Sequence, residues 1–541
     1  MRFWVVLLLM GGLLAPWLAR AQTFGSAVQV GSLSSFEISE ASGIVASRQN
    51  SNVLWTHNDT GFGGSIFAIS TNGTPLGRWY VPTASFGNFE DIAIGPGPNP
   101  EHQYVYLGDI GDNFTNRTSI RVFRFPEPAV YPYYSNSPPV LPLFGVQEIQ
   151  MAYPDGVFDA EAMMVDPWTG DLFIATKQTN SARLYRATRA ELDGGSPIEL
   201  TFIREMIFNG FRSVGAADIS FDGRLICMRR NGRVWTWNRA LNQTVGAALA
   251  ASGSQQSVAT NEVNGEAIGF HATGLGYYTT AEGFQPPLNY FRRTDASLPA
   301  QPVVFIRPGE DWRYQDTGAD EGTAWRGMTF DDSAWASGPA QLGYGQGDEQ
   351  TVVSFGFDDF EKNVTTYFRR QFTRPSAVTN LSLQLCFTDG VAVYLNDTEI
   401  FRRNLPASAI YDALATGSNR EKQNFWTAVP VLPSLLRAGT NTIAVELHRE
   451  DRQQTDLSFD LQLVQGTVNL PVRFTGPPQV VGGSWRIGLA GPPGALATLE
   501  LSNDLALWSV AGQLVLTNGT GQYLESVQSG NQPRFFRVKK E

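Results

Sequence analysis

The residues from Asn88 to Phe125, NFEDIAIGPGPNPEHQYVYLGDIGDNFTNRTSIRVFRF, decide the fold of this chain. They comprise an acidic opening, a short apolar strand, a Pro/Gly turn, a second strand that ends in an acidic loop, and a third strand. Short apolar runs separated by Gly, Pro, Asn and Asp are typical of β-strands joined by turns. The same order recurs through the first 300 residues, so this stretch is one copy of a repeated unit.

Each copy opens with an acid just before an apolar run. The five openings are Glu40 in EASGIVA, Glu90 in EDIAIG, Glu161 in EAMMVD, Asp218 in DISFD and Glu266 in EAIGF. Their separations of 50, 71, 57 and 48 residues predict an array of small sheets.

A displaced strand predicts how the array closes. Four copies carry an outer fourth strand, in GRWYV, QEIQMAY, TFIREMIF and QTVGAALA, and the fifth copy lacks one. Ala27 to Ser34 precedes the first copy and has no unit of its own. An N-terminal strand that completes the last blade closes a ring, which predicts a five-bladed β-propeller over residues 22–300. Six blades remain open if the insert from Ala129 to Gly145, interpreted as a loop, forms another, and a solenoid is the alternative architecture.

Composition indicates an all-β protein of about three domains. The 541 residues are 42% hydrophobic and only 17% charged, with 54 glycines and 31 prolines. The 51 acidic residues exceed the 40 basic ones, and the net charge of −11 disfavours nucleic acid or an anionic membrane as a partner.

Residues 1–21, MRFWVVLLLMGGLLAPWLARA, have the pattern of a signal peptide, which predicts a secreted, periplasmic or cell-surface protein. A retained N-terminal anchor is the alternative. No later segment approaches the roughly 20 apolar residues of a membrane span. Cys227 and Cys386 lie in predicted strands of different domains, so we expect two buried thiols rather than a disulfide.

Three stretches of the repeat resemble known propellers. SEASGIV, the NFEDIA/YLGDIGDN pair and FDAEAMMVDPWTGDLFIATK are similar to blades of secreted bacterial propeller proteins. More loosely they resemble the calcium-containing gluconolactonase, strictosidine-synthase and esterase-like phytase groups. The resemblance implies a fold and not an activity, because propellers host many unrelated functions.

The acids that open the blades are the first candidate site. Innermost strands start at the propeller axis, so Glu40, Glu90, Glu161, Asp218 and Glu266 are expected around one channel mouth. Calcium suits such a ring, since it takes six to eight oxygen ligands in loose geometry. The alternatives are hydrogen bonds from each acid to backbone N–H groups of the neighbouring blade, and direct catalysis.

Loops after the second strands carry a second acidic set. His57 and Asp59 lie in THNDTG, and Asp109, Asp112 and Asn113 lie in GDIGDN. They extend the site as a ligand or calcium loop, or they form Asx-turns. His57 is interpreted as a turn-stabilising residue. No known catalytic motif is present, so no residue is assigned a catalytic role.

Residues 301–466 resemble the galactose-binding-like jelly-roll modules, a β-sandwich. The motifs that carry the resemblance include TAWRGMTFDDSAWASGPAQLGYG, LQLCFTDGVAVYLNDTEIFRRN and AGTNTIAVELH. TDGVAVYLND predicts a hairpin with turns at Asp389-Gly390 and Asn396-Asp397. The tryptophans are interpreted as core residues or sugar platforms: Trp312, Trp325, Trp335 and Trp426. Asp331, Asp332 and Asp460 are expected to hold a structural calcium or to cap strands.

Residues 467–541 resemble a small C-terminal β-sandwich of large secreted proteins. Taken together, the sequence predicts a secreted, non-enzymatic binding protein with a cation-stabilised propeller, whose partner is an extracellular glycan or small molecule. The alternative is a calcium-dependent secreted hydrolase of the lactonase or phosphoesterase type, with Glu40 and Glu161 as cation ligands.

Overall fold

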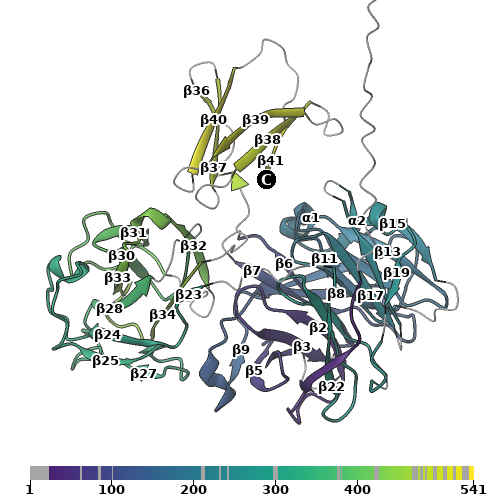
Figure 1. Cartoon of the computed structure of the whole chain (residues 1–541), viewed down its shortest axis with the longest axis horizontal. Coiled ribbons are helices and arrows are strands. Elements are labelled where there is room, and N and C mark those ends of the chain that lie inside the picture. The colour runs from purple at the N-terminus through teal and green to yellow at the C-terminus, as the bar shows by residue number, and fades with distance from the viewer. Residues whose placement is uncertain are drawn as a thin grey trace, which may run out of the picture.

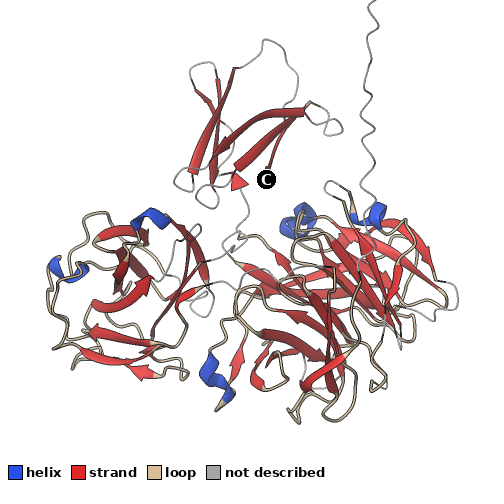
Figure 2. Ribbon diagram, viewed as in Figure 1, coloured by secondary structure: helices blue, strands red, loops and turns tan. Residues whose placement is uncertain are grey.

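The computed structural model is built almost entirely of β-strands (Figure 2). It describes residues 23–540 except 61–63, 83–86, 100–101, 209–213, 231–232, 241–242, 257, 263, 296–302, 375–377, 379–380, 419–425, 466–472, 475–478, 482–483, 491–495, 504–508, 516–519 and 527–534. The predicted signal peptide therefore lies outside the described residues. None of the helices in the described part of the chain has the length and apolar character needed to cross a bilayer.

The strands from β1 to β22 form five sheets, which we number by their first strands in chain order (Figure 1). Sheet 1 holds β2 (Ala41–Ala46), β3 (Val53–Asn58), β4 (Ser65–Ser70), β5 (Pro75–Tyr80) and β9 (Val140–Pro142). Sheet 2 holds β6 (Phe89–Pro96), β7 (Gln103–Asp109), β8 (Ile120–Pro126), β10 (Gln147–Ala152) and β14 (Ile198–Glu199). Sheet 3 holds β11 (Ala160–Val165), β12 (Leu172–Thr176), β13 (Ser181–Ala187) and β15 (Thr201–Ile207). Sheet 4 holds β16 (Ala216–Ile219), β17 (Leu225–Arg230), β18 (Arg233–Asn238) and β19 (Ser254–Gln256). Sheet 5 holds β20 (Ile268–Phe270), β21 (Gly276–Thr279), β22 (Pro287–Arg292) and β1 (Val28–Ser32).

The first strands of the five sheets contact one another in a cycle. β2 contacts β6, β6 contacts β11, β11 contacts β16, β16 contacts β20, and β20 contacts β2. The expected pairing of the N-terminal strand with the last sheet is confirmed, since β1 runs antiparallel to β22 with Val28 opposite Tyr290. The sheets that lie farthest apart in sequence are thus joined, and the starts of all five first strands lie close together.

Two segments differ from the sequence prediction. The fourth strand expected in QTVGAALA is instead helix α2 (Val245–Ala248), which Thr244 caps by accepting a hydrogen bond from Ala247 N, and β19 is the outer strand. Its alanines favour a helix over a strand. The insert from Ala129 to Gly145, interpreted as a loop, contains the 3-10 helix η1 (Pro132–Ser135) and β9, which pairs in parallel with β5. Helix α1 (Arg189–Gly194) begins with a capping box between Thr188 and Glu191.

Strands β23 to β34 form two six-stranded sheets. One holds β27 (Thr351–Val352), β26 (Leu342–Tyr344), β34 (Leu457–Val464), β29 (Leu381–Phe387), β32 (Thr427–Val431) and β23 (Val304–Ile306). The other holds β25 (Ala336–Pro339), β24 (Asp311–Gln315), β28 (Thr365–Arg374), β33 (Gly439–His448), β30 (Gly390–Leu395) and β31 (Thr398–Arg403). Short 3-10 helices are η2 (Ala324–Arg326) and η4 (Pro433–Leu435). One apolar core joins both sheets, through residues such as Leu461 and Val445, as in a sandwich.

The two predicted turns of this segment have different outcomes. Asn396 and Asp397, at φ 53° and 74°, join the paired strands β30 and β31, so that hairpin turn is confirmed. The hairpin expected at Asp389-Gly390 is wrong, because β29 and β30 belong to opposite sheets and the chain crosses the sandwich there. All four tryptophans singled out in the sequence are buried, so they are core residues and not sugar platforms. Both cysteines are buried free thiols, as predicted.

The insert in sheet 1 packs against the sandwich. Tyr131 and Tyr134 share one apolar core with Cys386 and Trp426, and the Trp426 indole N–H donates to Asn50 Oδ1 at 3.2 Å. Tyr134 OH donates to the buried carboxylate of Asp348 at 2.9 Å. Burial raises the pKa of Asp348 to about 6 despite that bond. The residues that looked like a loop therefore carry a contact between two groups of sheets.

Removing the Tyr134 hydroxyl tests this contact. We expect Tyr134→Phe to lower the free energy of unfolding by about 1–2 kcal/mol, because Asp348 then loses a hydrogen bond inside the protein. Urea unfolding followed by tryptophan fluorescence measures the change, with Tyr411→Phe on an open loop as the matched control. Equal stability of the two variants would contradict the prediction.

The described strands after residue 472 form two further small sheets around a core that includes Ile487 and Leu499. The first holds β35 (Arg473–Phe474), β37 (Ser484–Ala490), β36 (Gln479–Val481) and β40 (Thr520–Ser526). The second holds β39 (Ser509–Val515), β38 (Leu496–Ser502) and β41 (Phe535–Lys540).

Candidate functional site

β-Bulges at the starts of three first strands shape the candidate site. The strand register shifts between Ala41 and Ile44 in β2, between Phe89 and Asp91 in β6, and between Ala160 and Ala162 in β11. A bulge adds one residue to a strand and re-aims its side chain. In β6 and β11 the added residues are Glu90 and Glu161.

The starts of the five first strands and their neighbouring loops bring seven acids together around one lysine. The raised pKa values of Glu90, Asp59 and Glu282 trace this grouping, because each responds to the charges of the others' neighbours. We call the group the carboxylate cluster: Glu40, Asp59, Glu90, Asp159, Glu161, Glu266, Glu282 and Lys177. Four of the five blade-opening acids are members, so the expectation that these acids meet holds for Glu40, Glu90, Glu161 and Glu266.

Glu90 is the most perturbed acid of the cluster. Its side chain is buried, and burial followed by the charges of Asp59 and Asp159 raises its pKa to about 9. Asn88 Nδ2 donates to Glu90 Oε1 at 2.5 Å. At neutral pH the Glu90 carboxyl therefore carries a proton.

Lys177 offsets part of the negative charge. It follows β12 directly, and its ammonium forms an ion pair with Glu161 and lies 4.0 Å from Asp159 Oδ2. The other oxygen of Asp159, Oδ1, accepts a hydrogen bond from Asp112 N at 2.6 Å. The lysine favours the ionised form of Glu161, directly beside an acid that stays protonated.

The outer part of the cluster is open to solvent. Glu40 Oε2 accepts hydrogen bonds from the backbone and hydroxyl of Thr60, and Asp59 N donates to Glu40 O. Burial and the charge of Glu40 raise the pKa of Asp59 to about 6. Burial and the charge of Glu266 raise the pKa of Glu282 to about 7. Several carboxyl groups here thus change charge between pH 5 and 8.

Asp218 does not join the cluster, which corrects the expected five-membered ring. Its carboxylate accepts hydrogen bonds from Ile219 N at 2.8 Å and from Phe270 N at 2.7 Å. Asp91 has the same arrangement in sheet 2, where it accepts from Ile92 N, Met163 N and Ala217 N. These two acids bind the first strands together, which is the structural alternative considered from the sequence.

His57 lies beneath the cluster and is fully buried. Its Nδ1 lies 3.1 Å from Asn58 O, so Nδ1 carries the proton and Nε2 is left as an acceptor. Burial lowers the pKa of His57 to about 4 and keeps the ring neutral. Nε2 has no hydrogen-bond partner among the described residues. It faces β6, because a Cβ on Gly43 would lie 2.7 Å from it and 2.8 Å from Asp91 Oδ1, which leaves room there only for glycine.

The GDIGDN loop supports the cluster and is not built as a calcium loop. Asp109 is buried and forms ion pairs with Arg117 and Arg121, which occupy both of its oxygens. Asp112 accepts from Arg117 N at 2.8 Å, as expected of an Asx-turn, and Asn113 is exposed. Gly111 gives the loop its close approach, since a Cβ there would collide with Asn88 and Glu90.

Metal binding gains no support from the donor sets. Within the described ranges, no group of three or more His, Cys, Asp or Glu side chains is placed to hold a metal ion. The acids singled out in the sandwich are engaged separately: Asp332 pairs with Arg369, Asp460 accepts from Gly309 N and Leu461 N, and Asp331 accepts from Ser333 N. Calcium therefore stays a prediction of the sequence, and we route no chemical step through it.

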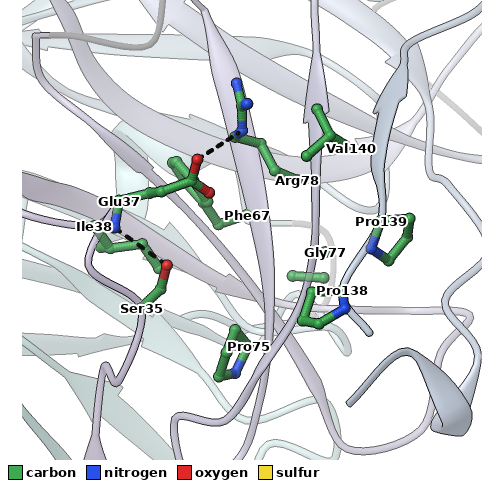
Figure 3. A pocket seen from close by; sticks show the side chains of 11 residues that line it. Ser35, Glu37, Ile38, Phe67, Pro75, Gly77, Arg78, Pro138, Pro139 and Val140 are labelled. Carbon is green, nitrogen blue, oxygen red and sulfur yellow. Dashed lines mark hydrogen bonds and ion pairs between the residues drawn. The ribbon is translucent and has the colours of Figure 1, made fainter. Parts of the chain in front are cut away.

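A separate pocket opens beside sheet 1 (Figure 3). It has a volume of about 260 Å³ and lies between the segment before β2 and the strands β4, β5 and β9. Its apolar walls include Phe67, Pro75 and Pro139, and its charged groups are Glu37 and Arg78, whose ion pair spans 3.5 Å. No member of the carboxylate cluster lines it, so it lacks the paired acids that acid–base chemistry needs.

Several site residues were missed in the sequence. Asp159 lies two residues before Glu161, Lys177 ends the same strand position as Asn58 and Asp109, and Glu282 follows β21. The position of Lys177 after DLFIAT was the available signal, because the ends of second strands had already been singled out in sheets 1 and 2.

The fold and site define an all-β protein with a mixed-protonation carboxylate cluster where five sheets meet. No family model and no curated protein matches the chain. Solved structures that match include β-glucuronidase 2 of Bacteroides uniformis covalently bound to cyclophellitol-6-carboxylate aziridine, at 15% identity and TM-score 0.22, covering 44% of this chain and 28% of that one. A glycosyl hydrolase family 2 member from Bacteroides cellulosilyticus matches at 13% identity and TM-score 0.23, covering 44% and 30%. Lactobacillus rhamnosus β-glucuronidase matches at 15% identity and TM-score 0.22, covering 45% and 42%.

These comparisons contradict the function expected from the sequence. The matching structures are glycoside hydrolases, not non-enzymatic binding proteins or hydrolases of the lactonase or phosphoesterase type. The resemblance to gluconolactonase-type propellers is not shown by them either. The matches span less than half of each neighbour's length, and TM-scores near 0.22 assign no activity to this chain.

Proposed function

We propose that the chain hydrolyses glycosidic bonds at the carboxylate cluster. The observation that carries the proposal is a protonated acid, Glu90, in the same cluster as a carboxylate, Glu161, held by a lysine ion pair. Hydrolysis of a glycosidic bond needs this pair of roles, a proton donor and an ionised carboxylate.

The residues take the following roles. Glu90 donates its proton to the glycosidic oxygen as the bond from that oxygen to the anomeric carbon breaks, so the leaving sugar departs as an alcohol. Glu161 supplies the negative charge on the other side of the ring, as nucleophile or as the base that activates water. Lys177 positions Glu161 and maintains its charge. Asn88 orients Glu90 through its side-chain amide.

A screen of p-nitrophenyl glycosides tests this function. We expect release of p-nitrophenol from at least one glycoside by the wild-type protein and its loss in Glu161→Gln. Glu148→Gln is the matched control, because Glu148 lies on the outer strand β10 and is 40% exposed. Absence of turnover on every aryl glycoside, or equal turnover in Glu161→Gln, would rule the proposal out.

We further propose that sheets 1–5 form a five-bladed β-propeller, with the sandwich and the C-terminal sheets as separate domains over 301–466 and 467–541. The cyclic contacts of the first strands and the pairing of β1 with β22 support this architecture. Export from the cytoplasm by the predicted signal peptide is part of the same proposal. N-terminal sequencing of the mature protein tests it.

A further inference from the structure

The carboxylate cluster presents hydrogen-bond acceptors that nothing in the described protein satisfies. His57 Nε2 is fully buried, carries no proton and has no hydrogen-bond partner. Asp59 Oδ1 is likewise removed from solvent and without a partner. Buried polar atoms in native proteins are almost always paired, so two orphan acceptors in one site indicate a missing donor. A ligand that completes the site therefore brings N–H or O–H groups.

Charge narrows the kind of donor. Seven acids share the cluster with Lys177, and the proximity of Asp59, Asp159 and Glu266 to Glu90 shows how closely negative groups approach each other there. An anionic ligand would add to this repulsion, whereas a cationic one relieves it. Lys177 already places an ammonium against Glu161 and close to Asp159. The cluster is thus built to accept this group.

Two exposed aromatic rings lie at the edge of the cluster. Phe36 and Phe284 are 77% and 69% exposed, and their ring centroids are 5.6 Å apart. Their loops are joined by a hydrogen bond from Gly283 N to Ser39 O, which places the rings beside Glu40 and Glu282. Exposed aromatic rings offer flat apolar surface to a ligand, and they also attract cations.

We propose that the substrate is a saccharide that carries a free amine, in which the ammonium binds the carboxylate cluster and the sugar ring stacks on Phe36 and Phe284. This inference names the substrate class of the proposed glycosidase and rests on that function. The ammonium supplies donors to Asp59 and to the acceptor of His57, and its charge offsets the surplus of acids. N-acetylation removes the charge, and a uronic acid reverses it.

Calorimetric titration with monosaccharides tests the inference without any turnover. The probes are glucosamine, N-acetylglucosamine and glucuronic acid, added to the wild-type full-length protein at pH 7. We expect glucosamine to bind about tenfold more tightly than N-acetylglucosamine, because a charge-assisted hydrogen bond is lost on acetylation. Glucuronic acid is expected to bind most weakly.

Matched variants locate the binding. Asp59→Asn and Phe284→Ala should each weaken glucosamine binding by about tenfold. Asp358→Asn and Phe357→Ala, an adjacent pair on an exposed loop of the sandwich, should leave it unchanged. Equal affinity for the three sugars, or equal effects of site and control variants, would overturn the inference.

The two proposals fail in different ways. Hydrolysis of neutral glycosides without any preference for an amine would overturn the substrate class and leave the glycosidase standing. Amine-selective binding that depends on Asp59, with no hydrolysis of any glycoside, would support the inference and remove the glycosidase.

Discussion

Glu90→Gln is expected to make the protein more stable at neutral and alkaline pH while it removes hydrolysis. The pKa of Glu90 is about 9 in the folded protein, above its ordinary value of 4.5. A raised pKa means that the folded state favours the protonated form, so the contribution of Glu90 to stability is fully present below pH 4.5. It is lost progressively as the pH rises toward 9.

Glutamine keeps the shape of protonated glutamic acid and cannot ionise. The gain in free energy of unfolding should therefore be near zero at pH 4.5 and reach roughly 3–5 kcal/mol at pH 8, at about 1.4 kcal/mol for each pKa unit. Loss of the general acid should lower turnover by about a hundredfold or more. Thermal unfolding of both proteins from pH 4.5 to 9 measures the first effect and glycoside hydrolysis the second.

Glu148→Gln again serves as the control, since this half-exposed residue is on the same sheet and should shift stability by no more than about 0.5 kcal/mol at any pH. A Glu90→Gln variant whose stability follows that of the wild-type protein across the whole pH range would show that Glu90 is not held protonated. It would also take away the acid that the proposed mechanism requires.

Periodicity predicted which acids gather, but not their depth. Glu40, Glu90, Glu161 and Glu266 could be found from their place before each apolar run, because strand starts meet where the sheets meet. The bulges could not be found in this way, since an added residue in β6 or β11 leaves the apolar pattern readable in either register. Asp218 was therefore aligned with Glu90, although its structural counterpart is Asp91.

Contacts between distant parts of the chain were also invisible in the sequence. Asp109 looked like a cation ligand because Arg117 and Arg121, which neutralise it, lie eight and twelve residues further on. The insert with Tyr134 looked like a loop because its partner, Asp348, is more than two hundred residues away. Local pattern reports turns and strands, whereas the charge balance of a site depends on which loops fold against it.

Asp91→Ala is expected to destabilise the protein strongly, because one carboxylate joins three sheets. Asp91 Oδ1 accepts from Ile92 N at 2.9 Å in β6, and Oδ2 accepts from Met163 N at 2.8 Å in β11 and Ala217 N at 3.1 Å in β16. The side chain is fully buried. Burial raises the pKa of Asp91 well above its ordinary value, against the lowering effect of the three N–H donors. Alanine would leave those donors unsatisfied at roughly 1–3 kcal/mol each, for a total loss of about 3–6 kcal/mol.

Asp218 supplies the matched comparison, since it occupies the same position in sheet 4 but accepts from two backbone N–H groups, those of Ile219 and Phe270. Asp218→Ala should thus lose about two thirds as much free energy of unfolding as Asp91→Ala, and both variants should lose more than Asp358→Ala on its exposed loop. Urea unfolding of the three variants orders them. If Asp91→Ala lost no more than Asp358→Ala, the first strands would be held together by packing alone, and His57 and Glu90 would owe their positions to the apolar core rather than to this carboxylate.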